Sequence, residues 1–101
     1  MTANGIRPVH PGEILREEFL LPLDISPTAL ARALRVSAPT VNEIVRERRD
    51  VTADMAIRLG RYFDTTAQFW MNLQTDYSLA TTLAANGEAI EHEVEPLRAL
   101  R

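Results

Sequence analysis

The chain has 101 residues, a mass of 11.3 kDa and a formal net charge of −3, with 46% apolar and 25% charged residues. This length leaves room for one domain, and the composition is that of a globular protein rather than a disordered or fibrous one. The sequence has no cysteine, which excludes disulfides and thiolate metal sites, and it has neither a membrane-spanning apolar run nor a signal peptide, so we expect a cytoplasmic protein.

The first predicted helix covers residues 11–21 and follows an N-terminal arm of residues 1–10. Pro11 suits the first position of a helix, and the carboxylate of Glu13 favours the positive end of the helix dipole. One apolar face follows, made of Ile14, Leu15, Phe19 and Leu20. Because proline interrupts the hydrogen bonds of a helix, Pro22 is expected to end this one.

Two short helices are predicted next, over residues 27–34 and 38–47. Ser26 and Ser37 are their candidate N-caps, and each helix carries a proline in its first turn, where proline is tolerated. Two short helices joined by a tight turn are typical of a helix-turn-helix, in which the second helix lies in the major groove of DNA.

The apolar residues of segment 27–47 fit this motif. Small Ala31 falls where the two helices touch, and the positions that fix their angle are Leu30, Leu34, Val36, Val41 and Ile44. The alternative is that any all-α domain can contain two short amphipathic helices, with arginines that only solvate a loop.

The outward positions of the second helix form a predicted DNA-reading surface. Asn42 can pair with adenine and Arg46 with guanine, Ala38 suits a methyl contact, and Glu43 can accept from cytosine or repel a wrong register. The candidates for phosphate contacts are Ser37, Thr40, Arg48 and Arg49. Residues 35–49 hold four arginines against two glutamates, a local excess of positive charge in an acidic chain.

Two longer helices complete the prediction. Thr52 caps the fourth, and Thr65 with Gln68 reads as a capping box that opens the fifth, which runs to about Ala85 before Asn86-Gly87 ends it. The result is an all-α domain of five helices over residues 11–85.

The C-terminal tail, residues 86–101, is ambiguous, because the spacing of its apolar residues is helical while segment 90–94 also suits a short strand. Its apolar residues Ile90, Val94 and Leu97 are candidates for contact with a dimer mate or a basic toxin, with a solvated fold-back tail as the alternative.

The aromatic segment before the tail divides between core and surface. Phe69 and Leu73 are expected to fill the core. Trp70 and Tyr77 suit the core and a partner interface equally, because aromatic residues are common in both.

No catalytic constellation or cofactor motif stands out in the sequence. The two histidines, His10 and His92, are too few and too far apart to predict a metal site. We therefore expect a protein that is not an enzyme and that needs no metal, cofactor, membrane or small-molecule substrate.

Four segments of the sequence resemble the HigA-type antitoxin family, which belongs to the XRE class of helix-turn-helix proteins related to phage lambda repressor. These segments are His10-Pro11-Gly12-Glu13-Ile14-Leu15, Leu30-Ala31-Arg32-Ala33-Leu34, Val41-Asn42-Glu43-Ile44-Val45 and Phe69-Trp70-Met71-Asn72-Leu73-Gln74. The resemblance implies a lambda-repressor-like fold and a homodimer that binds double-stranded operator DNA and represses its own operon. It also implies a RelE-like (HigB-type) toxin partner that cleaves mRNA.

Three departures from the family pattern bear on the DNA-reading surface. Arg35 stands where the turn usually holds glycine, so Arg35 adopts a positive φ or the turn differs. Pro27 replaces a glutamine that touches a phosphate, so that contact is lost or passes to Thr28. Arg46-Glu47-Arg48-Arg49 replaces an Asn-Gly-Lys-Arg sequence.

Two other functions remain compatible with the sequence. A solitary XRE transcriptional regulator would keep the fold and the DNA surface but have no toxin. A protein-binding adaptor would keep the helix-turn-helix only as a scaffold, and it would show no salt-dependent DNA binding.

Overall fold

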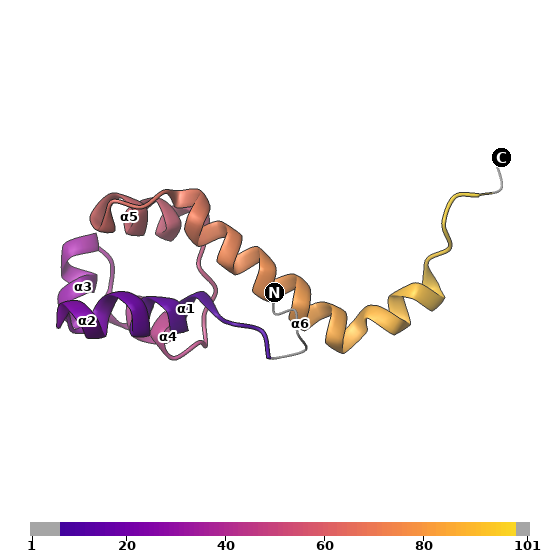
Figure 1. The fold of residues 1–101 in the computed structure, drawn as a ribbon, viewed down its shortest axis with the longest axis horizontal. Coiled ribbons are helices and arrows are strands. Elements are labelled where there is room, and N and C mark those ends of the chain that lie inside the picture. Colours follow the sequence, from indigo (N-terminus) through magenta and orange to yellow (C-terminus); the bar gives the residue numbers. More distant parts are fainter. Residues whose placement is uncertain (1–6, 99–101) are drawn as a thin grey trace.

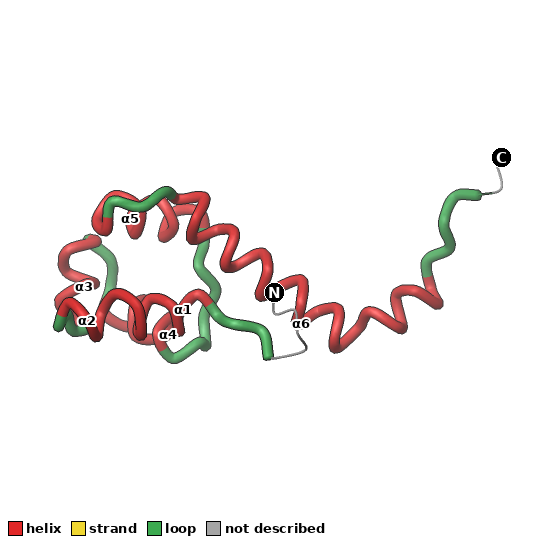
Figure 2. The backbone as a smooth tube through the Cα atoms, in the orientation of Figure 1, coloured by secondary structure: helices red, strands yellow, loops and turns green. Residues whose placement is uncertain are grey.

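The computed structural model describes residues 7–98, and its helices and loops are shown in Figures 1 and 2. Residues 1–6 of the predicted arm and 99–101 of the predicted tail lie outside the described residues. The first helix is continuous over residues 11–23 and consists of α1 (Pro11–Ile14), η1 (Leu15–Leu20) and α2 (Leu21–Leu23). The later helices are α3 (Pro27–Leu34), α4 (Ala38–Val45), α5 (Ala53–Phe63) and α6 (Ala67–Glu93). Within residues 7–98 there are five helices and no strand, so the predicted all-α class is confirmed.

The first helix is longer than predicted because Pro22 does not end it. Segment η1 is π-helical, and the N–H of Leu21 donates to the carbonyl of Arg16, five residues earlier. This wider turn relieves the clash between a proline ring and the carbonyl four residues before it. The helix ends instead at Asp24, which adopts a left-handed conformation with φ of 55°.

Helix α3 has the predicted bounds, and the turn after it explains Arg35. Arg35 adopts a left-handed conformation with φ of 63°, and the N–H of Val36 donates to the carbonyl of Ala31 at 3.0 Å. The tight turn of the motif is therefore kept without its usual glycine, at the steric cost that a side chain meets in this conformation.

Helix α4 begins at the predicted cap but ends two residues early. The Ser37 hydroxyl accepts from the N–H of Thr40 at 3.3 Å. Glu47 turns left-handed with φ of 63°, and the N–H of Arg48 bonds to the carbonyl of Glu43 at 2.8 Å. The arginines after α4 therefore lie on a loop.

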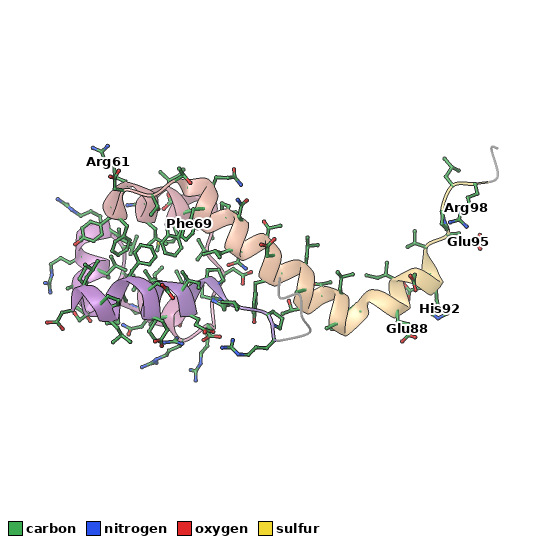
Figure 3. All side chains as sticks on the ribbon, in the orientation of Figure 1. Arg61, Phe69, Glu88, His92, Glu95 and Arg98 are labelled. Carbon is green, nitrogen blue, oxygen red and sulfur yellow. The ribbon has the colours of Figure 1, made fainter. Side chains whose placement is uncertain are left out.

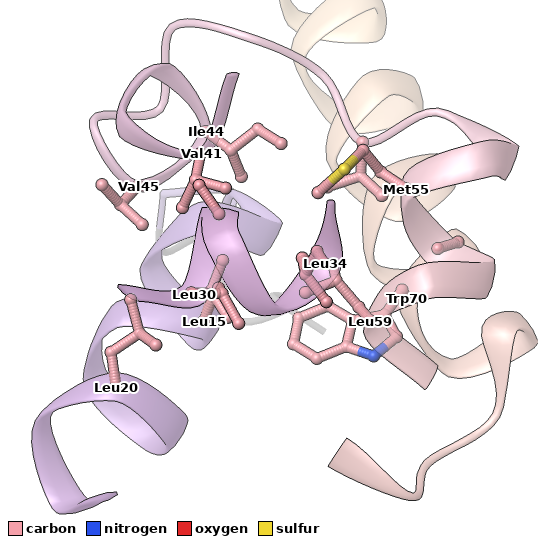
Figure 4. Packing of buried hydrophobic residues seen from close by; sticks show 13 residues of the cluster. Leu15, Leu20, Leu30, Leu34, Val41, Ile44, Val45, Met55, Leu59 and Trp70 are labelled. Atoms are coloured by element: carbon pink, nitrogen blue, oxygen red, sulfur yellow. The ribbon is translucent and has the colours of Figure 1, made fainter. Parts of the chain in front are cut away.

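A single hydrophobic core joins the first helix, α3, α4, α5 and the start of α6 (Figure 4). Its fully buried side chains include Leu15, Leu30, Ile44, Leu59 and Trp70. The positions predicted to fix the helix-turn-helix angle are buried, except that Val36 is only partly buried.

The cap of α6 is Thr66 rather than the predicted Thr65. The Thr66 hydroxyl accepts from the N–H of Phe69 at 3.0 Å. Thr65 instead accepts from the indole N–H of Trp70 at 2.9 Å, which satisfies the one polar atom of that buried side chain. Gln68 donates to Asn72 rather than back to the cap.

Helix α6 runs to Glu93, so the predicted end near Ala85 is wrong, as is the strand alternative for segment 90–94. Asn86 and Gly87 both stay helical, because a glycine inside a helix costs only about 1 kcal/mol. The second half of α6 projects away from the other helices, and the molecule measures 56 × 26 × 22 Å (Figure 1).

The first helix approaches α4 backbone to backbone at Gly12. Gly12 is buried, and a Cβ atom at this position would overlap the carbonyl oxygen of Ile44. The glycine of the His10-Pro11-Gly12-Glu13 segment is therefore required by close approach.

Replacing Gly12 with alanine tests this contact. We expect Gly12→Ala to lower the free energy of unfolding by about 1–3 kcal/mol or more, because the clash is with backbone and not with a flexible side chain. Gly87→Ala is the matched control, since its Cβ would meet only the Leu83 side chain at 3.4 Å; it should leave stability unchanged or raise it by up to about 1 kcal/mol. Urea unfolding of the three proteins decides, and equal midpoints for the wild type and Gly12→Ala would contradict the contact.

Candidate nucleic-acid interface

One face of α4 is fixed in the core and the opposite face is left outward. Val41 and Ile44 are fully buried and Val45 is 7% exposed. On the other side, the structure places the predicted site residues in exposed or half-buried positions: Ser37, Ala38, Thr40, Asn42, Glu43, Arg46, Arg48 and Arg49. Thr28 is exposed at the start of α3. The helix-turn-helix thus presents a polar surface on a rigid support.

The C-terminal end of α4 is held by an arginine from the first helix. The guanidinium of Arg16 donates to the carbonyl of Val45 and to the carboxylate of Glu47, the latter at 3.3 Å. A cation at this end satisfies free carbonyl groups and favours the negative end of the helix dipole. Sequence reasoning missed Arg16, because its partners lie about thirty residues away and no local pattern marks them.

The start of α4 carries two hydroxyls that bond to each other. The Ser37 and Thr40 oxygens are 2.7 Å apart, and Ser37 is exposed. Exposed hydroxyls beside the free N–H groups of a helix start suit the oxygens of an anion such as phosphate.

Asn42 lies half-buried in the middle of the outward face. Its Nδ2 donates to the carbonyl of Ala38 at 3.0 Å. An amide has a second N–H and a carbonyl oxygen, so Asn42 keeps a donor and an acceptor for a ligand. This is the pair of groups that adenine recognition uses.

The arginines after α4 are not equivalent. Arg49 donates to the Glu43 carboxylate through two nitrogens, at 2.9 and 2.7 Å. Arg46 and Arg48 are exposed, and neither forms a salt bridge with any residue of 7–98. Arg35, just before α4, is likewise exposed and without a salt bridge there, so the positive charge available to a ligand comes from these three arginines.

The loop after α4 is fixed from α6 by Gln74. This side chain is 6% exposed; its Oε1 accepts from the N–H of Val51 at 2.7 Å, and its Nε2 donates to Ser78 at 3.0 Å. Gln74 ends the aromatic segment singled out in the sequence, but the sequence assigned it no role. The one sequence feature that could have pointed to Gln74 was its position in that segment.

His10 is a buried N-cap of the first helix that packs against Tyr77 of α6. Its Nδ1 accepts from the N–H of Gly12 at 2.8 Å, and its ring lies edge-on to Tyr77 with the ring centroids 4.8 Å apart. Burial lowers the pKa of His10, although the nearby carboxylates of Glu47 and Asp50 oppose the shift. Because Nδ1 accepts a hydrogen bond from the N–H of Gly12, this nitrogen carries no proton, and the lowered pKa favours the neutral ring.

A second titrating group lies on the outer side of the first helix. Arg7 donates to both oxygens of Glu13, at 2.8 and 3.0 Å, and this pairing lowers the pKa of the Glu13 carboxyl.

Within residues 7–98 there is no cluster of side chains that would hold a metal ion, and none of their helices is long and apolar enough to cross a bilayer.

The residues predicted to contact a partner differ in how exposed they are. Trp70 is fully buried in the core, so of the two roles that the sequence left equally open it has the core role, and the partner contact is wrong. Phe69, expected in the core, is 37% exposed and borders a surface groove, and Tyr77 is half-buried against His10. The apolar tail residues are exposed, at 46% for Ile90, 64% for Val94 and 78% for Leu97.

Comparisons with known proteins agree with this geometry. The helix-turn-helix family model HTH_3 matches residues 15–70. The solved structure of Pseudomonas aeruginosa antitoxin HigA with the higBA promoter is 78% identical, covers 90% of this chain and 99% of its own, and has a TM-score of 0.87. Antitoxin GraA in complex with its operator is 55% identical, covers 95% and 97%, and has a TM-score of 0.88. Virulence-associated protein I of Dichelobacter nodosus is 58% identical over 76 residues, which are 75% of this chain and 70% of the relative.

The buried histidine predicts how stability depends on pH. The unfolded chain binds a proton near the ordinary histidine pKa of about 6.5, whereas the pKa of His10 in the fold is lower. The stabilisation that neutral His10 contributes is therefore fully present above the unfolded pKa of about 6.5. It is lost as the pH falls below about 6.5 and through the lower pKa of His10 in the folded protein. His10→Asn keeps a capping acceptor and does not titrate. We expect its free energy of unfolding to fall less than that of the wild type between about pH 7.5 and pH 5.

The control for this experiment is His92→Asn, because His92 is exposed near the end of α6. It should show the pH dependence of the wild type in urea unfolding. If wild type and His10→Asn lose stability in parallel, the buried neutral histidine is not the cause.

Proposed function

Because the chain belongs to the HigA-type antitoxin family of the XRE class of helix-turn-helix proteins, we propose that it is a sequence-specific DNA-binding antitoxin that represses its own operon in the cytoplasm. One observation carries this proposal. Helix α4 is fixed through its buried face, through Gly12 and through Arg16, while Asn42 and Arg46 point away from the core.

The proposed division of labour follows the chemistry of the side chains. Asn42 and Arg46 read base edges in the major groove, and Ala38 contacts a thymine methyl group. Contacts to the phosphates come from Thr28, Ser37, Thr40, Arg48 and Arg49. Arg49 leaves its ion pair with Glu43 to reach a phosphate, which frees Glu43 to accept from cytosine or to oppose a wrong register.

We further propose that the protein acts as a homodimer joined along α6. The exposed half of this helix carries Leu79, Leu83 and Ile90, which are 58%, 65% and 46% exposed. Their spacing of four and seven residues places them on one side of a helix, and such a stripe is unfavourable in water unless a partner covers it. Two copies would present two α4 helices to half-sites about one turn of DNA apart.

The acidic end of α6 suits a basic toxin. Glu88, Glu91, Glu93 and Glu95 are all exposed, and Figure 3 shows Glu88, His92, Glu95 and Arg98 at the end of the molecule away from the core. Exposed carboxylates attract a basic partner and speed its association. A small RelE-like (HigB-type) toxin that binds here is therefore the proposed second partner.

Substitutions on α4 and in the loop after it test the DNA-binding proposal. Asn42→Ala or Arg46→Ala should weaken binding to the protein's own upstream DNA by about 1–3 kcal/mol, with little effect on a shuffled sequence. Arg48→Ala should weaken binding to both DNAs and reduce the salt dependence by about one counterion. Fluorescence anisotropy at two salt concentrations measures both effects.

The matched control is Arg61→Ala. Arg61 is an exposed arginine on α5 (Figure 3), so this substitution removes the same charge from another face of the protein. It should bind the upstream DNA within about twofold of the wild type. Equal and weak binding of the wild-type protein to upstream and shuffled DNA would contradict the repressor and favour the adaptor.

Co-expression tests the toxin. We expect a tagged chain to retain the product of a short, basic reading frame next to its own gene. Replacing the four exposed glutamates of residues 88–95 by glutamine should slow this association about tenfold at low salt, while DNA binding by α4 persists. The absence of any such neighbour, together with intact upstream binding, would identify a solitary regulator.

A further inference from the structure

A surface groove runs between the first helix and α6, away from α4. It consists of two adjoining hollows of about 360 and 290 Å³ that share Ile14 and Leu73. Phe19 and Phe69 line one end, and the side chain of Phe69 is 37% exposed there. The DNA-binding proposal uses none of these residues.

Two carboxylates border this apolar groove. Glu18 lines the first hollow and Asp76 lines the second, and both are exposed. A segment that fits the groove therefore combines apolar side chains with a positive charge.

The chain itself contains such a segment directly after α6. Val94 is extended, with φ of −108° and ψ of 114°, and Pro96 keeps the chain from continuing as a helix. Leu97 is 78% exposed and is followed by Arg98. Within residues 7–98 no hydrogen bond or salt bridge joins segment 94–98 to the body of the protein, apart from the bond that ends α6.

This segment does not reach the groove of its own chain. From Leu73 to Glu93, α6 advances about 30 Å, at about 1.5 Å per residue. The four residues from Glu93 to Leu97 span at most about 14 Å when fully extended. The occupant, if it is this segment, comes from another copy.

An antiparallel pair of α6 helices brings the segment of each copy to the groove of the other. Leu83 is the middle residue of the exposed apolar stripe and is 65% exposed. If the helices cross there, Glu93, ten residues after Leu83, faces Leu73 of the other copy, ten residues before it. The residues after Glu93 then lie over the groove.

We propose that the groove between the first helix and α6 binds segment 94–98 of a second copy of the chain, with Leu97 on the apolar floor and Arg98 beside Glu18. The inference rests on the α6 dimer of the proposed function and adds a second, reciprocal contact to it. Each copy gives its tail and receives the tail of its partner, as expected for a twofold dimer.

Disulfide trapping tests the contact, because the sequence contains no cysteine and any introduced one is unique. Tagged chains with Leu73→Cys are mixed with untagged chains with Leu97→Cys and oxidised. We expect a mixed disulfide dimer, and Phe69→Cys in place of Leu73→Cys covers a register one turn away. Ala33→Cys, exposed on α3, is the control partner and should give no mixed dimer with Leu97→Cys.

A separate variant distinguishes failure of this inference from failure of the α6 dimer. Leu83→Cys alone should form a homodimer disulfide if α6 pairs as proposed. If Leu83→Cys crosslinks but Leu97→Cys reaches neither Leu73→Cys nor Phe69→Cys, the groove contact is wrong and the dimer stands. If sedimentation shows only monomers, both are wrong. A disulfide within single chains that carry both Leu73→Cys and Leu97→Cys would place the tail in its own groove and overturn the exchange.

A charge exchange provides a test without cysteines. Glu18→Arg or Arg98→Glu should each raise the Kd of the dimer about two- to fivefold, as expected for an exposed ion pair. The double variant, which restores opposite charges, should return the Kd toward the wild-type value. Additive weakening in the double variant would mean that the two side chains do not meet.

Discussion

The contact at Gly12, where the first helix meets α4 without an intervening side chain, constrains most of what surrounds it. The glycine is buried against the Ile44 carbonyl. His10 caps the helix that carries Gly12, and Arg16, one turn later on the same helix, holds the last carbonyls of α4. Gln74 then fixes the loop that follows. The C-terminal half of α4 is therefore clamped from two sides, which leaves its outward face as the part of this rigid element that is free to meet a ligand.

The distribution of charge follows from the same arrangement. Two ion pairs, Arg49 with Glu43 and Arg16 with Glu47, neutralise charge around the end of α4. Near that end Arg46 and Arg48 form no salt bridge within residues 7–98, and four exposed glutamates, Glu88, Glu91, Glu93 and Glu95, lie in the last turns of α6 and just after it. For the proposed function, a small basic surface on an acidic protein limits binding to arbitrary DNA, so that selection falls to the side chains proposed to read bases.

The sequence was sufficient for features that depend on neighbours along the chain. Ser26, Ser37 and Thr52 cap their helices as predicted, since an N-cap and its partner lie three residues apart. The sequence was insufficient for helix ends and contacts that depend on packing between residues far apart in the chain. A π-helical segment lets Pro22 stay inside a helix, and Asn86-Gly87 does not stop α6. Thr65 serves the buried Trp70 instead of the helix start. Arg16 and Gly12 act on α4 about thirty residues away, a relation that no local pattern carries.

If α6 forms the proposed dimer interface, its projecting half relates the concentration of the protein to its resistance to proteolysis. Within residues 7–98, the part of the helix beyond about Leu83 has no core residue of its own chain to pack against. Helices without tertiary contacts are marginal in water and open locally, and open backbone is what proteases cut. In the proposed dimer, association covers this half-helix and depends on concentration by mass action. The proposal therefore implies that unassembled chains are cut at this half-helix more readily than assembled ones.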